Sequence, residues 1–120
     1  MTAKELVTEY YESGASRTRE GIARFLHDEM TLKWHSSKGY LQLEKSDILA
    51  LTAELEKSYC ASRLDITHII ADGDAVSVRY THYVNAFENP HEEMVLAHFI
   101  AIWEVMDGKL YNGYLMSQLG

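Results

Sequence analysis

His82 is the side chain best suited to acid–base chemistry in this sequence. It lies in an alternating run, Ala75–Val84, in which the residues on its predicted face are apolar or aromatic. An imidazole exchanges protons near neutral pH, so His82 on the wall of a pocket could act as an acid or a base. The alternative is a core histidine that forms a hydrogen bond with a neighbour.

Aromatic side chains supply the second group of candidates. Tyr10, in a predicted helix, can point its hydroxyl into a pocket and hydrogen-bond a ligand carbonyl, or can lie at the rim with its hydroxyl in water. Tyr11 is predicted to be rotated away from that side. Trp34 and Trp103 either narrow the pocket, which favours a flat, apolar or aromatic ligand, or fill the core. The candidate ligand-binding residues are Trp34, His68, Tyr80, Phe99 and Trp103.

Two further histidines and the cysteine have weaker patterns. His68 lies on the apolar side of the run Arg63–Ile70 and could neighbour His82 across a strand pair. Two histidines could hold a metal, but no third ligand is evident, whereas catalytic zinc uses three and structural zinc four. We therefore predict no metal and no cofactor. His98 is assigned to an interface, and Cys60 is predicted to be a small buried residue.

The elements that must position these residues are four β-like runs in the second half of the chain. The runs are Arg63–Ala71, Ala75–Phe87, Met94–Val105 and Lys109–Ser117. The turn signals between them are Asp72-Gly73-Asp74, Glu88-Asn89-Pro90-His91 and Asp107-Gly108. Asp-Gly favours tight hairpins, because type I′ turns need positive φ at both central residues. The pattern predicts a long, curled antiparallel sheet that encloses a pocket.

The first half of the chain predicts helices that can pack across one face of this sheet. Thr2 and Glu5 have the spacing of a capping box, and Ser13-Gly14 would end that helix. The next predicted segments are a helix over Arg17–His27, a short strand over Met30–His35 and a loop over Ser36–Tyr40. The last is a helix over Asp47–Ser58, with Ser46 as its cap. Its inward-facing residues are Ile48, Leu51 and Leu55. The predicted fold class is α+β.

The third run, Met94–Val105, is apolar on both predicted faces. Phe99 and Trp103 lie on one face, and Ile100 and Ile102 lie on the other. The helices are enough to cover only one face of the sheet, so the second face is expected to meet another protein. A twofold homodimer is the usual solution.

Composition limits the class of protein. The 120 residues are 47% hydrophobic and 24% charged, which predicts a single globular domain over residues 1–120. A net charge of −7 argues against a nucleic-acid partner and against an anionic membrane surface. One cysteine cannot form an internal disulfide. The N-terminus lacks the apolar core of a signal peptide and no run has membrane-spanning length, so we expect a cytoplasmic protein.

Three segments carry a resemblance to a known family. They are Gly21–Leu32, where a helix ends at an acidic turn before a strand, and the two hairpin segments Gly73–Thr81 and Ile102–Leu110. With the order of elements, they resemble the nuclear transport factor 2-like superfamily over essentially the whole chain, and its SnoaL-like, polyketide cyclase-like branch in particular. The resemblance implies a cone-shaped curved antiparallel sheet, with a short strand plus a four-stranded meander, covered by three N-terminal helices.

The resemblance also transfers individual positions. Tyr10 lies where ketosteroid isomerases carry the tyrosine that stabilises the oxyanion. Trp34 lies where they carry the carboxylate base, and Ile100 or Ala101 where they carry a protonated acid. An indole cannot accept the proton, so ketosteroid isomerase activity is not expected. No inward Asp-Arg-Asp group like that of the family's epoxide hydrolases is visible. SnoaL-like cyclases use an aspartate or a histidine on the pocket wall, and here His82 is available.

These observations lead to two functional expectations. The first is an isomerase, cyclase or dehydratase for a small hydrophobic carbonyl compound, in which His82 moves the proton and Tyr10 polarises an oxygen. The alternative is a non-catalytic ligand-binding or accessory dimer, which the missing carboxylate base favours. A protein–protein adaptor has less support, because no motif for a transport partner is readable.

Overall fold

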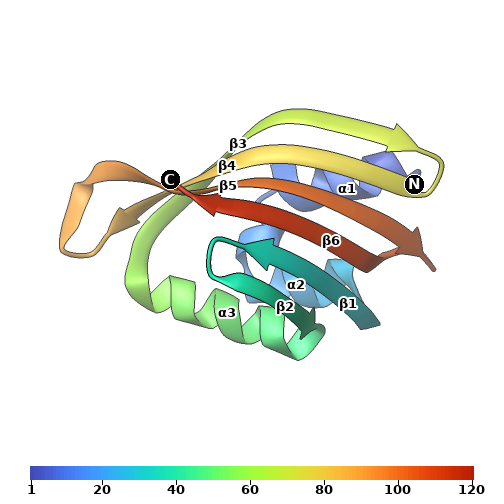
Figure 1. Ribbon diagram of the computed structural model, residues 1–120, viewed down its shortest axis with the longest axis horizontal. Helices are drawn as coiled ribbons and strands as arrows, with labels where there is room; N and C mark the ends of the chain where they lie inside the picture. The colour runs from blue at the N-terminus through green and yellow to red at the C-terminus, as the bar shows by residue number, and fades with distance from the viewer.

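Six strands form one curved, unclosed sheet in the computed structural model, which describes residues 1–120 (Figure 1). The strands are β1 (Leu26–Ser36), β2 (Gly39–Glu44), β3 (Tyr59–Asp72), β4 (Ala75–Ala86), β5 (Asn89–Met106) and β6 (Lys109–Leu119), and their order across the sheet is β2-β1-β6-β5-β4-β3. β3 to β6 form the predicted antiparallel meander, while β1 pairs in parallel with β6. The predicted α+β class and cone-like curvature are confirmed.

The helices come from the first half of the chain, as predicted. They are α1 (Ala3–Glu12), the 3-10 helix η1 (Ala15–Arg17), α2 (Arg19–Phe25) and α3 (Lys45–Ser58). α1 begins at the predicted capping box, in which the Thr2 hydroxyl accepts from the Glu5 backbone N–H and the Glu5 carboxylate accepts from the Thr2 N–H. In Figure 1, α1 and α2 lie behind the sheet and α3 runs below β2. No helix combines the length and apolar character that crossing a membrane requires.

The core lies between α1, α2 and the concave face of the sheet. Val7 and Ile22 from the helices pack with Val76 and Leu110 from the sheet, and each is at most 1% exposed. β5 alternates as predicted, since Ala97, Phe99, Ala101 and Trp103 face the core side and Ile100 and Ile102 are exposed on the other. The concave face is therefore the one that can line a pocket.

Several predicted boundaries in the first half are wrong. The segment Ser36–Tyr40 is not a simple loop, because Gly39 begins β2, which pairs with β1 as an additional strand. The second helix is shorter than predicted, and β1 already begins at Leu26. Ser46 does not cap α3, because the capping box is formed by Glu44 and Asp47, with Glu44 as the N-cap two residues before Ser46. The first two differences reflect strand pairing that extends into the neighbouring segment.

The turns follow the predicted signals with one shift. Asp107 and Gly108 both have positive φ, 55° and 70°, as a type I′ turn requires. Gly73 also has positive φ at the β3–β4 turn. Asn89, predicted within the next loop, instead begins β5, whose first part projects with the end of β4 beyond the helices (Figure 1).

A β-bulge in β3 changes which residues face the concave side. Ile66 pairs with Tyr80 and His68 with Arg79, so Thr67 is an extra residue in the ladder. Beyond this bulge Ile69, not His68, packs on the core, while Ile70 is 63% exposed. The prediction that His68 shares the face of Leu64 and Ile66 is wrong for this reason.

Candidate functional site

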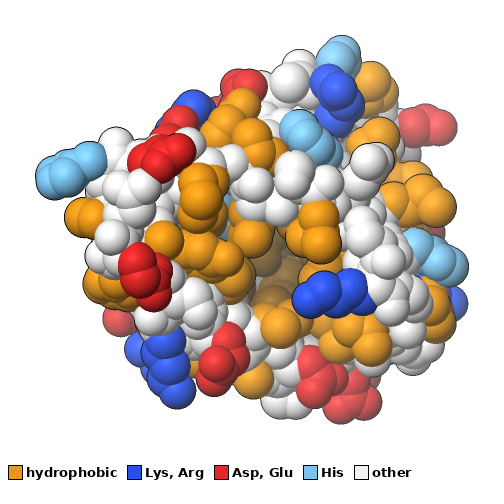
Figure 2. Space-filling view, turned by 60° about the vertical axis from the view of Figure 1, so that its left-hand side comes forward, with side chains coloured by type: hydrophobic (Ala, Val, Ile, Leu, Met, Phe, Trp, Pro, Cys, Tyr) orange, Lys and Arg blue, Asp and Glu red, His pale blue; other side chains and the backbone are white.

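Two adjoining cavities open between the helices and the concave face. The first, here called the inner chamber, has a volume of about 170 Å³ and is walled mainly by apolar and aromatic side chains. The second, the outer pocket, has a volume of about 250 Å³ and lies between η1, the end of α3 and the start of β3. Figure 2 shows a hollow bordered by hydrophobic side chains, with a basic side chain beside it. The residues shared by both cavities are Ser16, Arg17, Thr52, Leu55 and His82.

α3 stands over the inner chamber without closing it. Leu51 and Leu55 line the chamber, as the inward-facing prediction requires, yet they remain 41% and 37% exposed. Thr52 is the buried residue of this helix, and its hydroxyl donates to the Ile48 carbonyl. The apolar face of α3 therefore has no complete protein partner, and the space beneath it is available to a ligand.

An aromatic cluster forms the floor of the inner chamber. Tyr80 stacks on Phe99 with ring centroids 5.0 Å apart, and Tyr11 lies 5.0 Å from Tyr80. The Trp103 indole donates a 2.8 Å hydrogen bond to the Tyr11 hydroxyl. The prediction that Tyr11 is rotated away from the chamber is therefore wrong. Tyr11 lines the chamber together with Tyr10. Trp103, 4% exposed, both fills the core and lines the chamber.

The tyrosines of this cluster are neutral hydrogen-bonding groups. Burial raises the pKa of Tyr11 to about 12, although its hydrogen bonds oppose the shift. Burial also raises the pKa of Tyr10 and Tyr80 well above the ordinary value for a phenol. All three hydroxyls therefore keep their protons at neutral pH.

Trp34 closes the chamber on the β1 side. It is half-buried, lines the chamber, and donates a 2.8 Å hydrogen bond from its indole nitrogen to the Ser117 hydroxyl on β6. This bond fixes the indole plane across two strands paired in parallel. Trp34 and Trp103 thus both reach the same chamber, which is the arrangement that suits a flat ligand.

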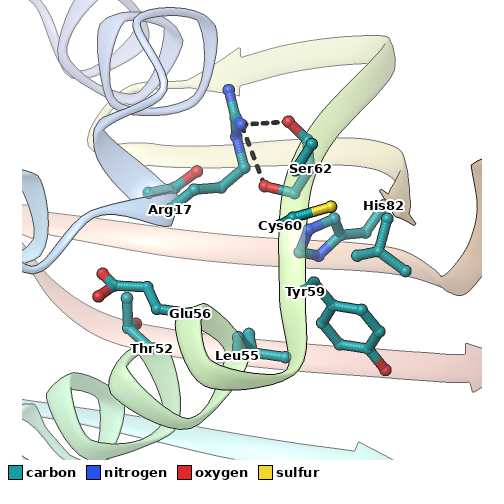
Figure 3. A pocket seen from close by; sticks show the side chains of 11 residues that line it. Arg17, Thr52, Leu55, Glu56, Tyr59, Cys60, Ser62 and His82 are labelled. Carbon is teal, nitrogen blue, oxygen red and sulfur yellow. Dashed lines mark hydrogen bonds between the residues drawn. The ribbon is translucent and has the colours of Figure 1, made fainter. Parts of the chain in front are cut away.

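Three polar atoms in the shared wall have no hydrogen-bond partner. They are the Oγ of Ser16, the Nε of Arg17 and the Nε2 of His82, and each is buried. Buried polar groups are nearly always paired, so three orphans around one cavity mark a place where a ligand could supply the missing partners. This set is called the polar corner below, and Figure 3 labels two of its members, Arg17 and His82.

His82 is neutral in the polar corner. Burial and, as the smaller cause, the positive charge of Arg17 together lower its pKa from 6.5 to about 4. The ring therefore has an unprotonated nitrogen at neutral pH and can accept a proton. β4 places it here because Val78, Tyr80 and His82 follow each other on the concave face.

Arg17 is positioned by η1 and β3. Its Nη1 donates to the Ser62 carbonyl at 2.6 Å and to the Ser62 hydroxyl at 3.2 Å (Figure 3). Gly14 adopts a left-handed conformation with φ 85°, which starts η1 and leaves room for the guanidinium. Sequence reasoning missed both Ser16 and Arg17 as site residues, because Arg17 was only the first residue of a predicted helix and Ser16 lies in the connection before it.

A protein-family model matches most of this chain, including all three α-helices and the first five strands in whole or in part. The model of the SnoaL-like domain matches residues 7–112. The chain belongs to the SnoaL-like domain family. Its fold is that of the nuclear transport factor 2-like proteins, as the sequence resemblance predicted. No curated protein sequence matches this chain.

Solved structures similar to this SnoaL-like protein share its fold at low sequence identity. IdmH of Streptomyces antibioticus, a candidate polyketide cyclase, is 12% identical with a TM-score of 0.79, covering 98% of this chain and 92% of IdmH. AclR of Streptomyces galilaeus, a candidate hydroxylase, is 16% identical with a TM-score of 0.79. The match covers 98% of this chain and 79% of AclR. TerC, crystallised with polyporic acid, is 22% identical with a TM-score of 0.69. The match covers 98% of this chain and 91% of TerC.

The other candidates of this SnoaL-like chain lie away from the cavities or have a different environment. His68 is exposed, and its Nδ1 contacts the Thr67 hydroxyl. His98 is exposed on the convex side, where its Nδ1 lies 3.0 Å from the Thr81 hydroxyl. Cys60 is exposed, not buried as predicted, and its Sγ lies 3.3 Å from the Asn85 carbonyl in the wall of the outer pocket. No three histidine, cysteine or acidic side chains gather as a metal site.

Proposed function

We propose that this SnoaL-like protein is an isomerase, cyclase or dehydratase for a small hydrophobic carbonyl compound, with His82 as its proton-transfer residue. The observation that carries the proposal is the buried Nε2 of His82, which has no partner and belongs to a neutral imidazole. A general base must be unprotonated and must face the substrate, and His82 is neutral and lines both cavities. A pKa of about 4 makes it a weak base, so stabilisation of the negative charge formed on the substrate has to contribute strongly.

The proposed reaction begins with removal of a proton next to the carbonyl group. The proton moves to His82, and the electron pair of the broken C–H bond moves to the carbonyl oxygen and forms an enolate. The imidazolium then returns the proton to a different carbon in an isomerisation, or to a departing hydroxyl group in a dehydration. Tyr10, whose raised pKa keeps it protonated, is the proposed donor to the enolate oxygen.

The proposed ligand is flat and largely apolar. Trp34, Tyr80, Phe99 and Trp103 all line the inner chamber and present ring surfaces to it. The structural neighbour TerC, which was crystallised with polyporic acid, supports the idea that this fold holds small molecules. His68 is not part of the proposed site, because the bulge in β3 turns it outward.

The test is exchange of the carbon-bound proton with solvent, which detects proton abstraction before any product is known. Aryl ketones with an unsaturated bond beyond the α-carbon serve as substrates, and deuterium uptake is followed by NMR. We expect His82→Gln to reduce the exchange rate by at least about a hundredfold, the contribution typical of a general base. His68→Gln, a matched histidine change on an exposed edge, should leave the rate unchanged. Equal rates in His82→Gln and the unmodified protein would contradict the assignment.

The second candidate function is non-catalytic binding of the same class of compound. The observation that favours it is the absence of a carboxylate base at Trp34, whose indole is held by Ser117. In this case the ketones bind but no exchange occurs in either protein. Calorimetric binding with no deuterium uptake would therefore select this second function.

We also propose that two copies of this SnoaL-like protein associate through the convex side of the sheet. Ile100 and Ile102 on β5 and Tyr114 and Met116 on β6 are 40–65% exposed there, and Tyr40 on β2 extends the surface. These five residues are called the convex apolar face. A twofold contact would cover the same side chains on both copies.

A further inference from the structure

The charge of Arg17 is not balanced by any acidic side chain. No carboxylate lies within 4.0 Å of its guanidinium, although Arg19 and Arg63 each form a salt bridge. Its only side-chain or backbone acceptors are the two oxygens of Ser62, which are neutral. A partly buried cation whose partners are all neutral attracts an anion more strongly than a solvated cation does.

The nearest acidic residue of the cavity wall is already engaged. Glu56 lines the outer pocket, but its carboxylate lies 3.3 Å from the Arg19 guanidinium. The other titratable side chains around His82 include no carboxylate: they are Tyr59 and Cys60 in the outer pocket, and Tyr10, Tyr11 and Tyr80 in the inner chamber. Arg17 therefore determines the sign of the charge in the polar corner, in a protein whose net charge is −7.

Two hydrogen-bond donors in the polar corner are vacant. They are the Nε–H of Arg17 and the hydroxyl of Ser16, and both atoms are buried without a partner. An oxygen anion is the partner that such donors bind most strongly, because hydrogen bonds to an ionised acceptor are charge-assisted. The aromatic walls of the inner chamber adjoin this corner, because Ser16, Arg17 and His82 line both cavities.

We propose that the polar corner is the binding site for a carboxylate, so that the natural ligand is an aromatic acid whose ring lies in the inner chamber. Its carboxylate accepts hydrogen bonds from Arg17 Nε and Ser16 Oγ. This inference adds a specificity-determining pair to the proposed function and rests on the same cavity, but it does not require that any reaction occurs.

A carboxylate in this corner also changes the protonation of His82. Arg17 contributes to the low pKa of His82, and a bound anion offsets that charge. The pKa of His82 is therefore expected to rise when an aromatic carboxylate binds. By thermodynamic linkage, the same carboxylate binds more tightly at low pH, where His82 is protonated.

The probes for the test are cinnamate and its neutral amide, cinnamamide, which differ only in the group that would meet the polar corner. Calorimetry at neutral pH should show that the unmodified protein binds cinnamate at least about tenfold more tightly, the ratio expected for one charge-assisted hydrogen bond. Arg17→Gln should bring the two dissociation constants together. Arg24→Gln removes the same charge from an exposed position on α2 and should keep the tenfold preference.

A measurement on the unmodified protein covers the case in which Arg17→Gln does not fold. NMR titration of the His82 ring should give a higher pKa with saturating cinnamate than with cinnamamide. Equal affinity for the two probes, an unchanged preference in Arg17→Gln, or no binding of cinnamate at millimolar concentration would each overturn the proposal. Loss of proton exchange on its own would contradict only the proposed reaction, because these readouts measure binding.

Discussion

At the scale of single residues, the site depends on one imidazole that is buried without a partner. Strand alternation places His82 among Val78, Tyr80 and Val84, and the helices exclude water from its Nε2. Its native pKa of about 4 is lower than the ordinary 6.5, so the unfolded chain binds a proton first as the pH falls. The contribution of His82 to the free energy of unfolding is therefore fully present above pH 6.5 and is lost as the pH falls toward 4.

This linkage gives a prediction for His82→Gln. The unmodified protein should lose more stability between about pH 7 and about pH 4 than the variant does, because glutamine does not titrate. The measurement is the urea midpoint of both proteins at the two pH values, which cancels the contribution of the other histidines and the carboxylates. A parallel loss in the two proteins would show that His82 has an ordinary pKa in the folded state.

The hydrogen bond between Trp103 and Tyr11 gives a second prediction at this scale. Tyr11→Phe leaves the Trp103 indole N–H buried without the acceptor that now lies 2.8 Å away. We expect a loss of about 1–3 kcal/mol in the free energy of unfolding, measured by urea denaturation. Tyr83→Phe, on the other face of β4, should change it by less than about 0.5 kcal/mol. A neutral Tyr11→Phe would mean that the indole has another partner.

The sequence allowed part of the site to be predicted at the scale of residues. Period-two alternation was sufficient to place Tyr80 and His82 on one face of β4, and Phe99 and Trp103 on one face of β5. Arg17 could not be found in this way, since its role depends on Ser62, which lies 45 residues away in the sequence. Helical spacing alone also misplaced Tyr11, whose hydroxyl is directed by the indole it meets.

At the scale of elements, the packing of α2 on η1 depends on a glycine. A Cβ at Gly21 would overlap the backbone of Ala15, including its carbonyl oxygen, and backbone cannot move aside as a side chain can. Gly21 is also buried, and its N–H donates to the Thr18 hydroxyl at the start of α2. The short connection that positions Ser16 and Arg17 is therefore fixed by this close approach.

Replacement of Gly21 tests this packing. Gly21→Ala should reduce the free energy of unfolding by about 3 kcal/mol or more, the upper range for overpacking. Gly113→Ala is the matched variant, because its Cβ would meet only the side chains of Leu32 and Trp103, at 2.6 Å. We expect a smaller loss there, by denaturant unfolding. A larger loss at Gly113 would contradict the rigid approach of α2 to η1.

Elements were predictable where local signals agreed with the tertiary structure. The capping box of α1 and the Asp107-Gly108 turn are local and were correct. β2 and the bulge at Thr67 were not predicted, because both arise from pairing with a neighbouring strand rather than from the segment's own pattern. The bulge is the reason that His68 is excluded from the site.

At the scale of the whole molecule, two apolar surfaces remain without a protein partner. The inner chamber is incompletely filled, and the convex apolar face is exposed on the opposite side of the same sheet. A single sheet with helices on one side leaves this second surface open. The proposed dimer and the proposed ligand site therefore use opposite faces, and either can be tested without disturbing the other.

The dimer prediction follows from this separation. Sedimentation of the unmodified protein at micromolar concentration should give twice the monomer mass. Ile102→Glu places a charge in the centre of the convex apolar face and should give a folded monomer, while Phe87→Glu, an exposed apolar residue on the β4–β5 turn, should stay dimeric. A monomeric unmodified protein would refute the proposed association.

The pKa of His82, read from an NMR titration of the histidine rings in the free protein, tests the central claim most directly. A value of about 4, well separated from the other histidines, is the result expected for an imidazole enclosed by aromatic walls next to an unbalanced guanidinium. A value close to 6.5 would show a solvated or hydrogen-bonded ring, and neither the proton transfer nor the polar corner would then have a structural basis.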